Sequence, residues 1–326
     1  MDISKIFIPG STFDFDKLAL QVFQYQAFNC SVYKEYLSYL KIDPLKVKSF
    51  QSIPFLPIQF FKNNTVICDK KEAEISFSSS GTSNTGQSIH HVSDLNLYKL
   101  SYTNCFEYFY GPIEDYTILA LLPNYLEREG SSLIFMVDDL IKKTKKHDGG
   151  FYLNDLHALS IRLNELNEQN TKVLLIGVSY ALQNLVEQYQ FRLKNTIIME
   201  TGGMKGRRKE LIREELHQIL ANGFGVNKIH SEYGMTELLS QAYSKGDGVF
   251  KCPAWMRILI RDPEDALTNI STQKSGGINI IDLANINSCS FIATQDLGRL
   301  NLDDTFEVLG RFDNSDIRGC NLMVVG

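Results

Sequence analysis

The spacing of apolar positions predicts helices first and then an alternation of strands and helices. From residue 13 to residue 40, apolar side chains recur every three or four positions, which indicates helical structure that ends before Asp43-Pro44. Residues 53–62 are also apolar, but two prolines lie three positions apart there, so we expect an extended connector packed on the core. Beyond it, short apolar runs alternate with amphipathic stretches, which is typical of crossover units in a largely parallel sheet.

These runs divide the chain into two predicted parts. Toward the C-terminus the helices stop and short strands follow one another. The sequence therefore predicts an α/β fold with a core at residues 1–250, which includes the helical N-terminal segment, and a small β-rich subdomain at residues 251–326. We expect strands at residues 116–122, 172–178, 196–199, 227–230, 256–261, 278–282, 291–293 and 305–309, and helices at residues 156–169, 180–192 and 206–221.

Composition and charge exclude several classes of protein. The net charge of −5 gives no overall attraction to nucleic acid, and the 44% of hydrophobic residues exclude a disordered chain. No apolar run approaches the roughly 18 residues that a membrane span requires. The six cysteines lie far apart without a CxxC pair, and no basic segment followed by an apolar one opens the sequence. We therefore expect a cytoplasmic protein with reduced thiols and without a structural zinc.

Residues 76–88 form the most distinctive local segment, because most of their side chains are small and carry hydroxyls. Glycines permit positive φ, so that successive backbone N–H groups can converge on an anion, and the hydroxyls add donors. A polyphosphate is the commonest ligand for such a loop, whereas a flexible surface loop is the alternative that composition alone favours. Residues 81–88 also match part of a Walker pattern, but Gln87 stands where the lysine is required, which argues against a P-loop NTPase.

A second cluster of polar residues, at 230–237, follows a predicted strand. Its aromatic residue can flank a base, its glycine permits a tight turn, and Glu237 can ligate Mg²⁺, which prefers oxygen ligands. The alternative is an ordinary turn with Glu237 at a helix N-terminus. Later in the chain, Asp296 can accept hydrogen bonds from vicinal hydroxyls such as those of ribose, and Arg311 can reach sugar or phosphate oxygens. A solvated Asp–Arg pair is the plain alternative.

In this order, the clusters resemble the motifs of adenylate-forming enzymes. That superfamily carries a Ser/Thr/Gly phosphate loop, then Tyr-Gly-x-Thr-Glu, Thr-x-Asp and Gly-Arg-x-Asp, which match residues 78–86, 233–237, 294–296 and 310–313. More narrowly, residues 50–322 resemble the LuxE-like acyl-protein synthetases, the fatty-acid-activating component of bacterial bioluminescence operons. The narrower match is carried by residues 53–58, Phe61-Lys62, residues 79–82, residues 121–128, residues 131–134 and Arg318-Gly319-Cys320.

The resemblance implies an adenylate-forming domain, with mixed, largely parallel sheets flanked by helices, that uses ATP and Mg²⁺. A carboxylic acid, which the narrower resemblance implies is a fatty acid, would attack the α-phosphorus of ATP, and a thiol would then attack the acyl-adenylate. Roles follow by position. The phosphates would be bound by Ser79, Ser80, Gly81, Thr82 and Thr85. Adenine would be surrounded by Tyr233, Gly234 and the backbone of Gly202 and Gly203. Thr236 would contact the α-phosphate, Glu237 would hold Mg²⁺, and the ribose would be bound by Asp296 and Arg311.

Two further residues are candidates for catalysis. In the LuxE-like family a cysteine near the C-terminus accepts the acyl group before passing it to a partner protein, and Cys320 stands at the matching place. The neighbouring Arg318 could lower the pKa of its thiol, whereas a buried, inert cysteine is the alternative. His91 follows the phosphate loop and could contact the substrate carboxylate or a phosphate, although a lone histidine is more often structural.

The chain departs from the superfamily after residues 310–313. Superfamily members usually continue into a mobile lid that carries a catalytic lysine, whereas this chain ends at Gly326, so we expect the lid to be truncated or absent. Three functions remain open. The first is acyl transfer to a protein thiol, such as that of an acyl reductase or a carrier protein. The second is an acyl- or aryl-CoA ligase or a carrier-protein ligase. The third is a non-catalytic nucleotide-binding subunit of a multi-enzyme complex.

Overall fold

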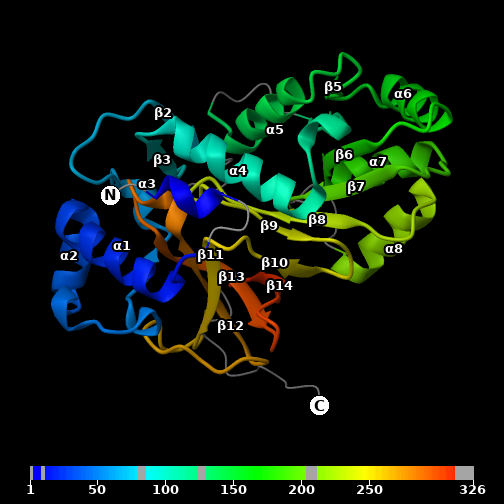
Figure 1. Cartoon of the computed structure of the whole chain (residues 1–326). Helices are drawn as coiled ribbons and strands as arrows, with labels where there is room; N and C mark the ends of the chain where they lie inside the picture. The colour runs from blue at the N-terminus through cyan, green and yellow to red at the C-terminus, as the bar shows by residue number, and fades with distance from the viewer. Residues whose placement is uncertain (1–2, 9–11, 80–85, 124–129, 203–210, 313–326) are drawn as a thin grey trace.

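The computed structural model describes residues 3–8, 12–79, 86–123, 130–202 and 211–312, and it confirms the α/β fold (Figure 1). Helices lie against one large mixed sheet. No helix within these ranges is long and apolar enough to span a membrane. The helices are α1 (Phe15–Asn29), α2 (Ser31–Tyr39), α3 (Phe60–Asn63), α4 (Leu95–Tyr110), α5 (Ser132–Lys143), α6 (Leu156–Glu168), α7 (Ser179–Gln188) and α8 (Arg213–Phe224). The strands are β1 (Leu56–Pro57), β2 (Ile75–Ser78), β3 (Ile89–Val92), β4 (Thr117–Leu121), β5 (Gly150–Phe151), β6 (Val173–Val178), β7 (Thr196–Thr201), β8 (His230–Tyr233), β9 (Ala242–Ser244), β10 (Val249–Lys251), β11 (Met256–Arg261), β12 (Ser275–Asp282), β13 (Phe291–Leu300) and β14 (Phe306–Arg311).

The main sheet has twelve strands and is mixed, with a parallel part and an antiparallel part. Strands β5, β4, β6, β7 and β8 run parallel, whereas from β8 through β9, β10, β14, β13 and β12 to β11 each neighbour is antiparallel. β4 and β6 are buried at every position because helices cover both faces of a parallel sheet. Strands on both sides of residue 250 share this one sheet, and the division into two domains there remains a prediction.

The expected elements are present, but several bounds differ: the helix expected at residues 180–192 ends at Gln188, the helix expected at 206–221 begins at Arg213 among the described residues, and the strand expected at 291–293 continues to Leu300. The strand at 256–261 has the bounds we expect from the sequence, but the strand expected at 227–230 instead occupies His230–Tyr233. The shift arises because Ser231 and Glu232 are polar and yet buried, so the pattern alone does not mark them as strand residues. The polar cluster at 230–237 therefore begins inside the sheet and not in a loop after it.

The N-terminal helical segment divides into α1 and α2 at Cys30, whose backbone is extended. Both helices pack on the β-rich part through an aromatic cluster. The rings of Phe23, Tyr33 and Phe55 lie 5.9, 6.3 and 6.2 Å from that of Phe291, the first residue of β13. The apolar connector after α2 runs parallel to β13 at β1, as an extended segment should, although its last residues form the single turn α3.

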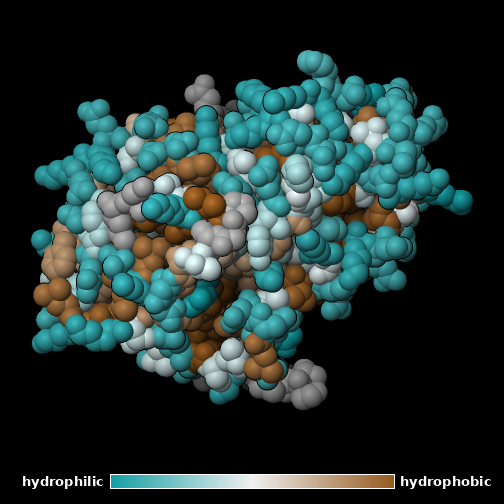
Figure 2. Space-filling model, in the orientation of Figure 1, coloured by the Kyte–Doolittle hydropathy of each residue, from teal (hydrophilic) through white to brown (hydrophobic). Residues whose placement is uncertain are grey.

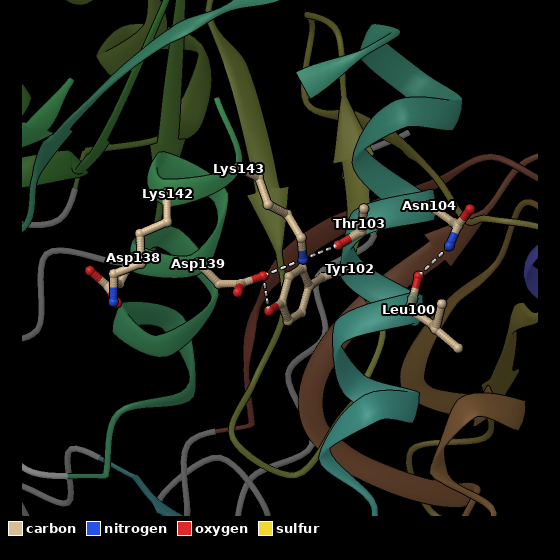
Figure 3. A network of polar contacts seen from close by, with 8 residues as sticks. All are labelled: Leu100, Tyr102, Thr103, Asn104, Asp138, Asp139, Lys142 and Lys143. Atoms are coloured by element: carbon tan, nitrogen blue, oxygen red, sulfur yellow. Dashed lines mark hydrogen bonds and ion pairs between the residues drawn. The ribbon is translucent and has the colours of Figure 1, made fainter. Parts of the chain in front are cut away.

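Polar contacts join α4 to α5 (Figure 3). The Tyr102 hydroxyl donates to Asp139 Oδ2 at 2.6 Å, Lys143 Nζ donates to Thr103 Oγ1 at 3.0 Å, and Lys143 also pairs with Asp139. On the face in Figure 2, hydrophilic side chains cover the region over α5 and α6, while apolar side chains show mainly in the middle of the molecule. The network therefore orders a helix pair that is apolar toward the sheet and polar toward water.

Gln26 links α1 to the segment between β12 and β13. Its Nε2 donates to the carbonyl oxygens of Asn285 and Ile286 at 3.0 and 2.9 Å and to Ser290 Oγ at 3.1 Å, while Ser290 N–H donates to Gln26 Oε1 at 2.9 Å. The side chain is fully buried. A single amide thus satisfies several groups that have no access to water.

We expect Gln26→Leu to lower the free energy of unfolding by about 2–4 kcal/mol, because it leaves buried partners unpaired. Urea denaturation measures this change. Gln21→Leu on the exposed side of α1 is the matched control and should stay within about 0.5 kcal/mol of the wild type. Equal effects of the two substitutions would contradict the role of this amide.

Candidate active site

A large cleft of about 2080 Å³ opens where the parallel strands end. Residues that end or follow β6, β7 and β8 line it together with residues of β13, β14 and α8. Binding sites in open α/β sheets lie at the carboxyl ends of the strands, where the topology changes. Here the change is the switch from parallel to antiparallel pairing at β8.

The serine-rich segment and the Tyr-Gly-Met-Thr-Glu segment meet at this cleft. Ser79 N–H donates to the Ser88 carbonyl and Ser88 N–H donates to Ser79 Oγ, both at 3.0 Å, so these two residues close the base of the loop. On β3, His90 Nδ1 donates to the carbonyl oxygen of Thr236 at 2.9 Å. This hydrogen bond joins segments 146 positions apart in the sequence.

Three polar residues form a second contact across the cleft wall. The Tyr233 hydroxyl donates to Asp296 Oδ2 at 2.8 Å, and Arg311 Nε donates to Asp296 Oδ1 at 3.1 Å. Burial and the neighbouring Asp296 carboxylate raise the pKa of Tyr233 well above its ordinary value. Arg311 is 77% exposed, whereas Asp296 is 9% exposed, so the carboxylate is fixed and the guanidinium faces the opening.

Glu237 is a buried carboxylate in the cleft. Burial raises its pKa, and a hydrogen bond with Ser88 opposes that shift. Among the described residues, no Lys, Arg or His forms an ion pair with it, so a bound cation would fit this position. The described residues contain no group of three or more His, Cys, Asp or Glu that could hold a metal ion. A Mg²⁺ at Glu237 would therefore take its other ligands from phosphates and water, as this ion commonly does.

The structure brings most of the described candidate residues together. Those that line the cleft are Ser79, Gly202, Tyr233, Gly234, Thr236, Glu237, Asp296 and Arg311. His91 is not among the residues lining it, since its Nδ1 lies 2.8 Å from Ser76 Oγ on the β2–β3 hairpin. Six further candidates lie outside the described residues, namely Ser80, Gly81, Thr82, Thr85, Gly203 and Cys320.

His90 is a residue whose place the sequence did not indicate. It is fully buried, and its Nε2 lies 3.1 Å from Asn285 Oδ1 while its Nδ1 binds Thr236. Burial, the larger effect, lowers the pKa of His90 to about 4, although both polar contacts oppose this shift. The signal was the adjacent pair His90-His91, because neighbouring strand residues point to opposite faces, and β3 belongs to a two-stranded sheet in which the burial of residues alternates.

Two carboxylates at the ends of β7 and β8 were also missed. Glu200 pairs with Ser231 in the sheet, and its Oε1 lies 3.7 Å from Arg213 Nε and 3.6 Å from His217 Nε2 on α8. Its Oε2 accepts a hydrogen bond from Ser179 at 3.0 Å. Burial raises the pKa of Glu200, but His217, Arg213 and a hydrogen bond with Ser231 together hold it below its ordinary value.

Glu232 lies on the face of the sheet opposite to that of Glu200. It shares this face with Thr201, its register partner on β7. The Thr201 hydroxyl donates to Glu232 Oε2 at 2.5 Å. Burial raises the pKa of Glu232 to about 7, and the nearby Glu200 adds to this rise. Glu232 belongs to the polar cluster at residues 230–237, but the sequence pattern did not distinguish the environment of its carboxylate from that of Glu200.

The titration of Glu232 predicts a pH dependence of stability. Since its pKa is about 7 in the folded state and 4.5 ordinarily, the folded state holds the proton more tightly between these values, and the free energy of unfolding falls as pH rises through this window. Glu232→Gln removes this titration. The variant should therefore gain roughly 3 kcal/mol relative to wild type between pH 4 and pH 8.

Urea denaturation at each pH measures this difference. Glu215→Gln, at an exposed position of α8, is the matched control and should track the wild type across the range. A difference between wild type and Glu232→Gln that does not change with pH would contradict the burial argument.

Comparison with solved structures identifies where this fold occurs. The 2-hydroxyisobutyryl-CoA ligase in its postadenylation state with 2-HIB-AMP has a TM-score of 0.68 and 12% identity, over 91% of this chain and 67% of that chain. ATP-bound MatB from Rhodopseudomonas palustris has a TM-score of 0.55 and 15% identity, over 74% of this chain and 49% of that chain, so this chain spans about half of MatB. No family model and no curated protein matches the sequence. The chain thus has the fold of adenylate-forming CoA ligases.

Proposed function

We propose that this chain activates a carboxylic acid with ATP and passes the acyl group to a thiol. The observation that carries the proposal is the hydrogen bond from His90 to Thr236, because it brings the base of the serine-rich loop and the Tyr-Gly-Met-Thr-Glu segment to one cleft. Asp296 and Arg311 lie in the same cleft. Its position at the ends of the parallel strands agrees with a nucleotide site.

Different residues of the cleft would bind different parts of ATP. Ser79, at the base of the serine-rich loop, would contribute a hydroxyl near the phosphates. Tyr233 would lie beside adenine, and Asp296 would accept hydrogen bonds from the ribose hydroxyls. Mg²⁺, when bound at Glu237, would neutralise phosphate charge.

The chemistry would proceed in two steps that use positioning more than covalent help from the protein. First, a carboxylate oxygen attacks the α-phosphorus, and the bond to pyrophosphate breaks. Thr236, at the start of the turn that His90 anchors, would hold the α-phosphate in line for this attack. Then a thiolate attacks the acyl carbon, and AMP leaves.

The acceptor thiol distinguishes the finer alternatives. The resemblance to LuxE-like synthetases favours a protein thiol, with Cys320 as a first acceptor, and a fatty acid as substrate. The solved ligases of this fold include one in complex with 2-HIB-AMP and CoA, which favours coenzyme A. Product analysis with each acceptor separates them. A chain that binds ATP tightly without releasing pyrophosphate would instead be a nucleotide-binding subunit.

Exchange between ATP and labelled pyrophosphate tests the first step. We expect acid-dependent exchange by the wild type, and Glu237→Gln should slow it roughly a hundredfold, because the variant loses the carboxylate that would hold Mg²⁺ against the phosphates. Glu264→Gln, at an exposed position outside the cleft, is the matched control and should retain wild-type exchange. The proposal fails if no acid supports exchange.

Labelling with radioactive acid tests the second step. If Cys320 accepts the acyl group, the wild type should retain a label that hydroxylamine removes, and Cys320→Ser should not, since an oxygen ester resists hydroxylamine. Pyrophosphate exchange by the variant checks that the first step is intact. A hydroxylamine-sensitive label that persists in Cys320→Ser would exclude this thiol from the reaction.

A further inference from the structure

The inner end of the cleft contains an unusual pair of polar side chains, Glu232 and Gln241. Both line the cleft, and they are 9% and 4% exposed. They converge on one point, since a Cβ placed on Gly234 would collide with Glu232 Oε1 and lie 3.5 Å from Gln241 Cγ. A side chain at position 234 would therefore displace the carboxylate from its present position.

Glu232 has few partners for its charge. Its neighbour Glu200 is surrounded by Arg213, His217 and Ser179. For Glu232, by contrast, the described residues supply the Thr201 hydroxyl and no ion pair with a Lys, Arg or His. The two carboxylates are one strand apart, so the difference reflects the two faces of the sheet.

Gln241 has an unmet hydrogen-bonding capacity. Its Oε1 is buried and has no hydrogen-bond partner among the described residues. A buried polar atom left unpaired typically costs about 1–3 kcal/mol. Such atoms are uncommon in protein interiors, and in a cleft a bound water or ligand can pair with one.

The backbone around Gln241 is held by hydrogen bonds from other elements. Cys105 Sγ donates to the Gln241 carbonyl at 3.3 Å. The preceding Ser240 donates through its N–H and its hydroxyl to the buried Asp282, and Trp255 Nε1 donates to Ser240 Oγ at 3.0 Å. The position of Gln241 is thus built into the fold.

The other walls near this pair come from α4 and α5. Tyr98, Ser132 and Met136 line the cleft, but the Tyr98 hydroxyl already donates to the Ser132 carbonyl at 3.0 Å. That hydroxyl is therefore not available to Glu232 or Gln241. A ligand that reaches this end of the cleft meets one carboxylate and one carboxamide whose bonding is incomplete.

We infer that the acid substrate carries a hydrogen-bond-donating group, an ammonium or a hydroxyl, which binds Glu232 and Gln241 at the inner end of the cleft. The inference rests on the proposed function. An alkyl tail, as in a fatty acid, would bury both side chains without partners. A site built to bond an N–H or O–H group rejects the analogue that lacks it far more strongly than an apolar pocket rejects an added polar group.

Matched acids test this inference by ATP–pyrophosphate exchange. One set comprises 4-aminobenzoate, 4-hydroxybenzoate and 4-methylbenzoate, and a second comprises straight-chain acids of four to eight chain atoms that end in ammonium, hydroxyl or methyl. In the wild type, we expect a donor-bearing acid to exceed its methyl counterpart by a hundredfold or more in kcat/KM.

Two variants locate the preference. Gln241→Met and Glu232→Gln should each reduce it at least tenfold, and Glu232→Gln should affect an ammonium acid more than a hydroxy acid, because it removes the counter-charge. Gln183→Met is the matched control. Gln183 on α7 also has a buried, unpaired Oε1 within the described part of the chain, but it does not line the cleft, so the preference should stay at the wild-type value. Circular dichroism and saturable exchange at high acid concentration check that each variant is folded.

The outcomes are separable. A wild type that prefers methyl-terminated acids, or a donor preference that neither cleft variant changes, overturns the inference and leaves the proposed function intact. Absence of exchange with every acid overturns the proposed function and this inference with it. A donor preference that falls in both cleft variants and persists in Gln183→Met supports the inference.

Discussion

The buried hydrogen bonds that His90 and Asn285 donate to the backbone of Thr236 and Glu237 are the interactions on which the site depends. Asn285 Nδ2 donates to the carbonyl oxygens of Glu237 and Cys289 at 2.8 and 3.0 Å, and its Oδ1 lies beside His90 Nε2, whose ring partner Nδ1 donates to Thr236. The side chains of His90 and Asn285, both buried, thus connect three segments, namely β3, residues 236–237 and residues 285–289. In a low-dielectric interior such a network is strong when complete and costly when one member is missing. The turn that carries Thr236 and Glu237 takes its position from this network.

A second constraint is the change of strand direction at β8. Parallel strands bring their carboxyl ends to one edge, whereas the antiparallel strands that follow return the chain, through β13 and β14, to the same cleft. Asp296 and Arg311 are register partners on these last two strands. Their approach to Tyr233 is therefore a consequence of sheet topology and not of local sequence. The same topology puts Glu200 and Glu232 on opposite faces, where one carboxylate meets cations and the other does not.

Much of the fold could be predicted from the sequence because buried strands leave a strong apolar signal. β6 and β11 appear where short runs such as Val173–Val178 indicate them. The split of the N-terminal helix at Cys30 could not be predicted, since apolar spacing is similar on both sides and the extended Cys30 pairs with Cys68, which is distant in the sequence. Nor could the start of β8 be placed, because Ser231 and Glu232 are polar residues whose burial depends on neighbours distant in the chain.

The sequence by itself determined the alternating α/β class and the kinds of side chain in the site, since periodicity and residue chemistry are local properties. It also predicted a nucleotide site from the order of four clusters, and described residues of all four line one cleft. Only the tertiary structure decided which of His90 and His91 is buried against Thr236, and which of two glutamates lacks a described cation. Burial and charge pairing are set by segments far apart along the chain, so no local pattern contains them.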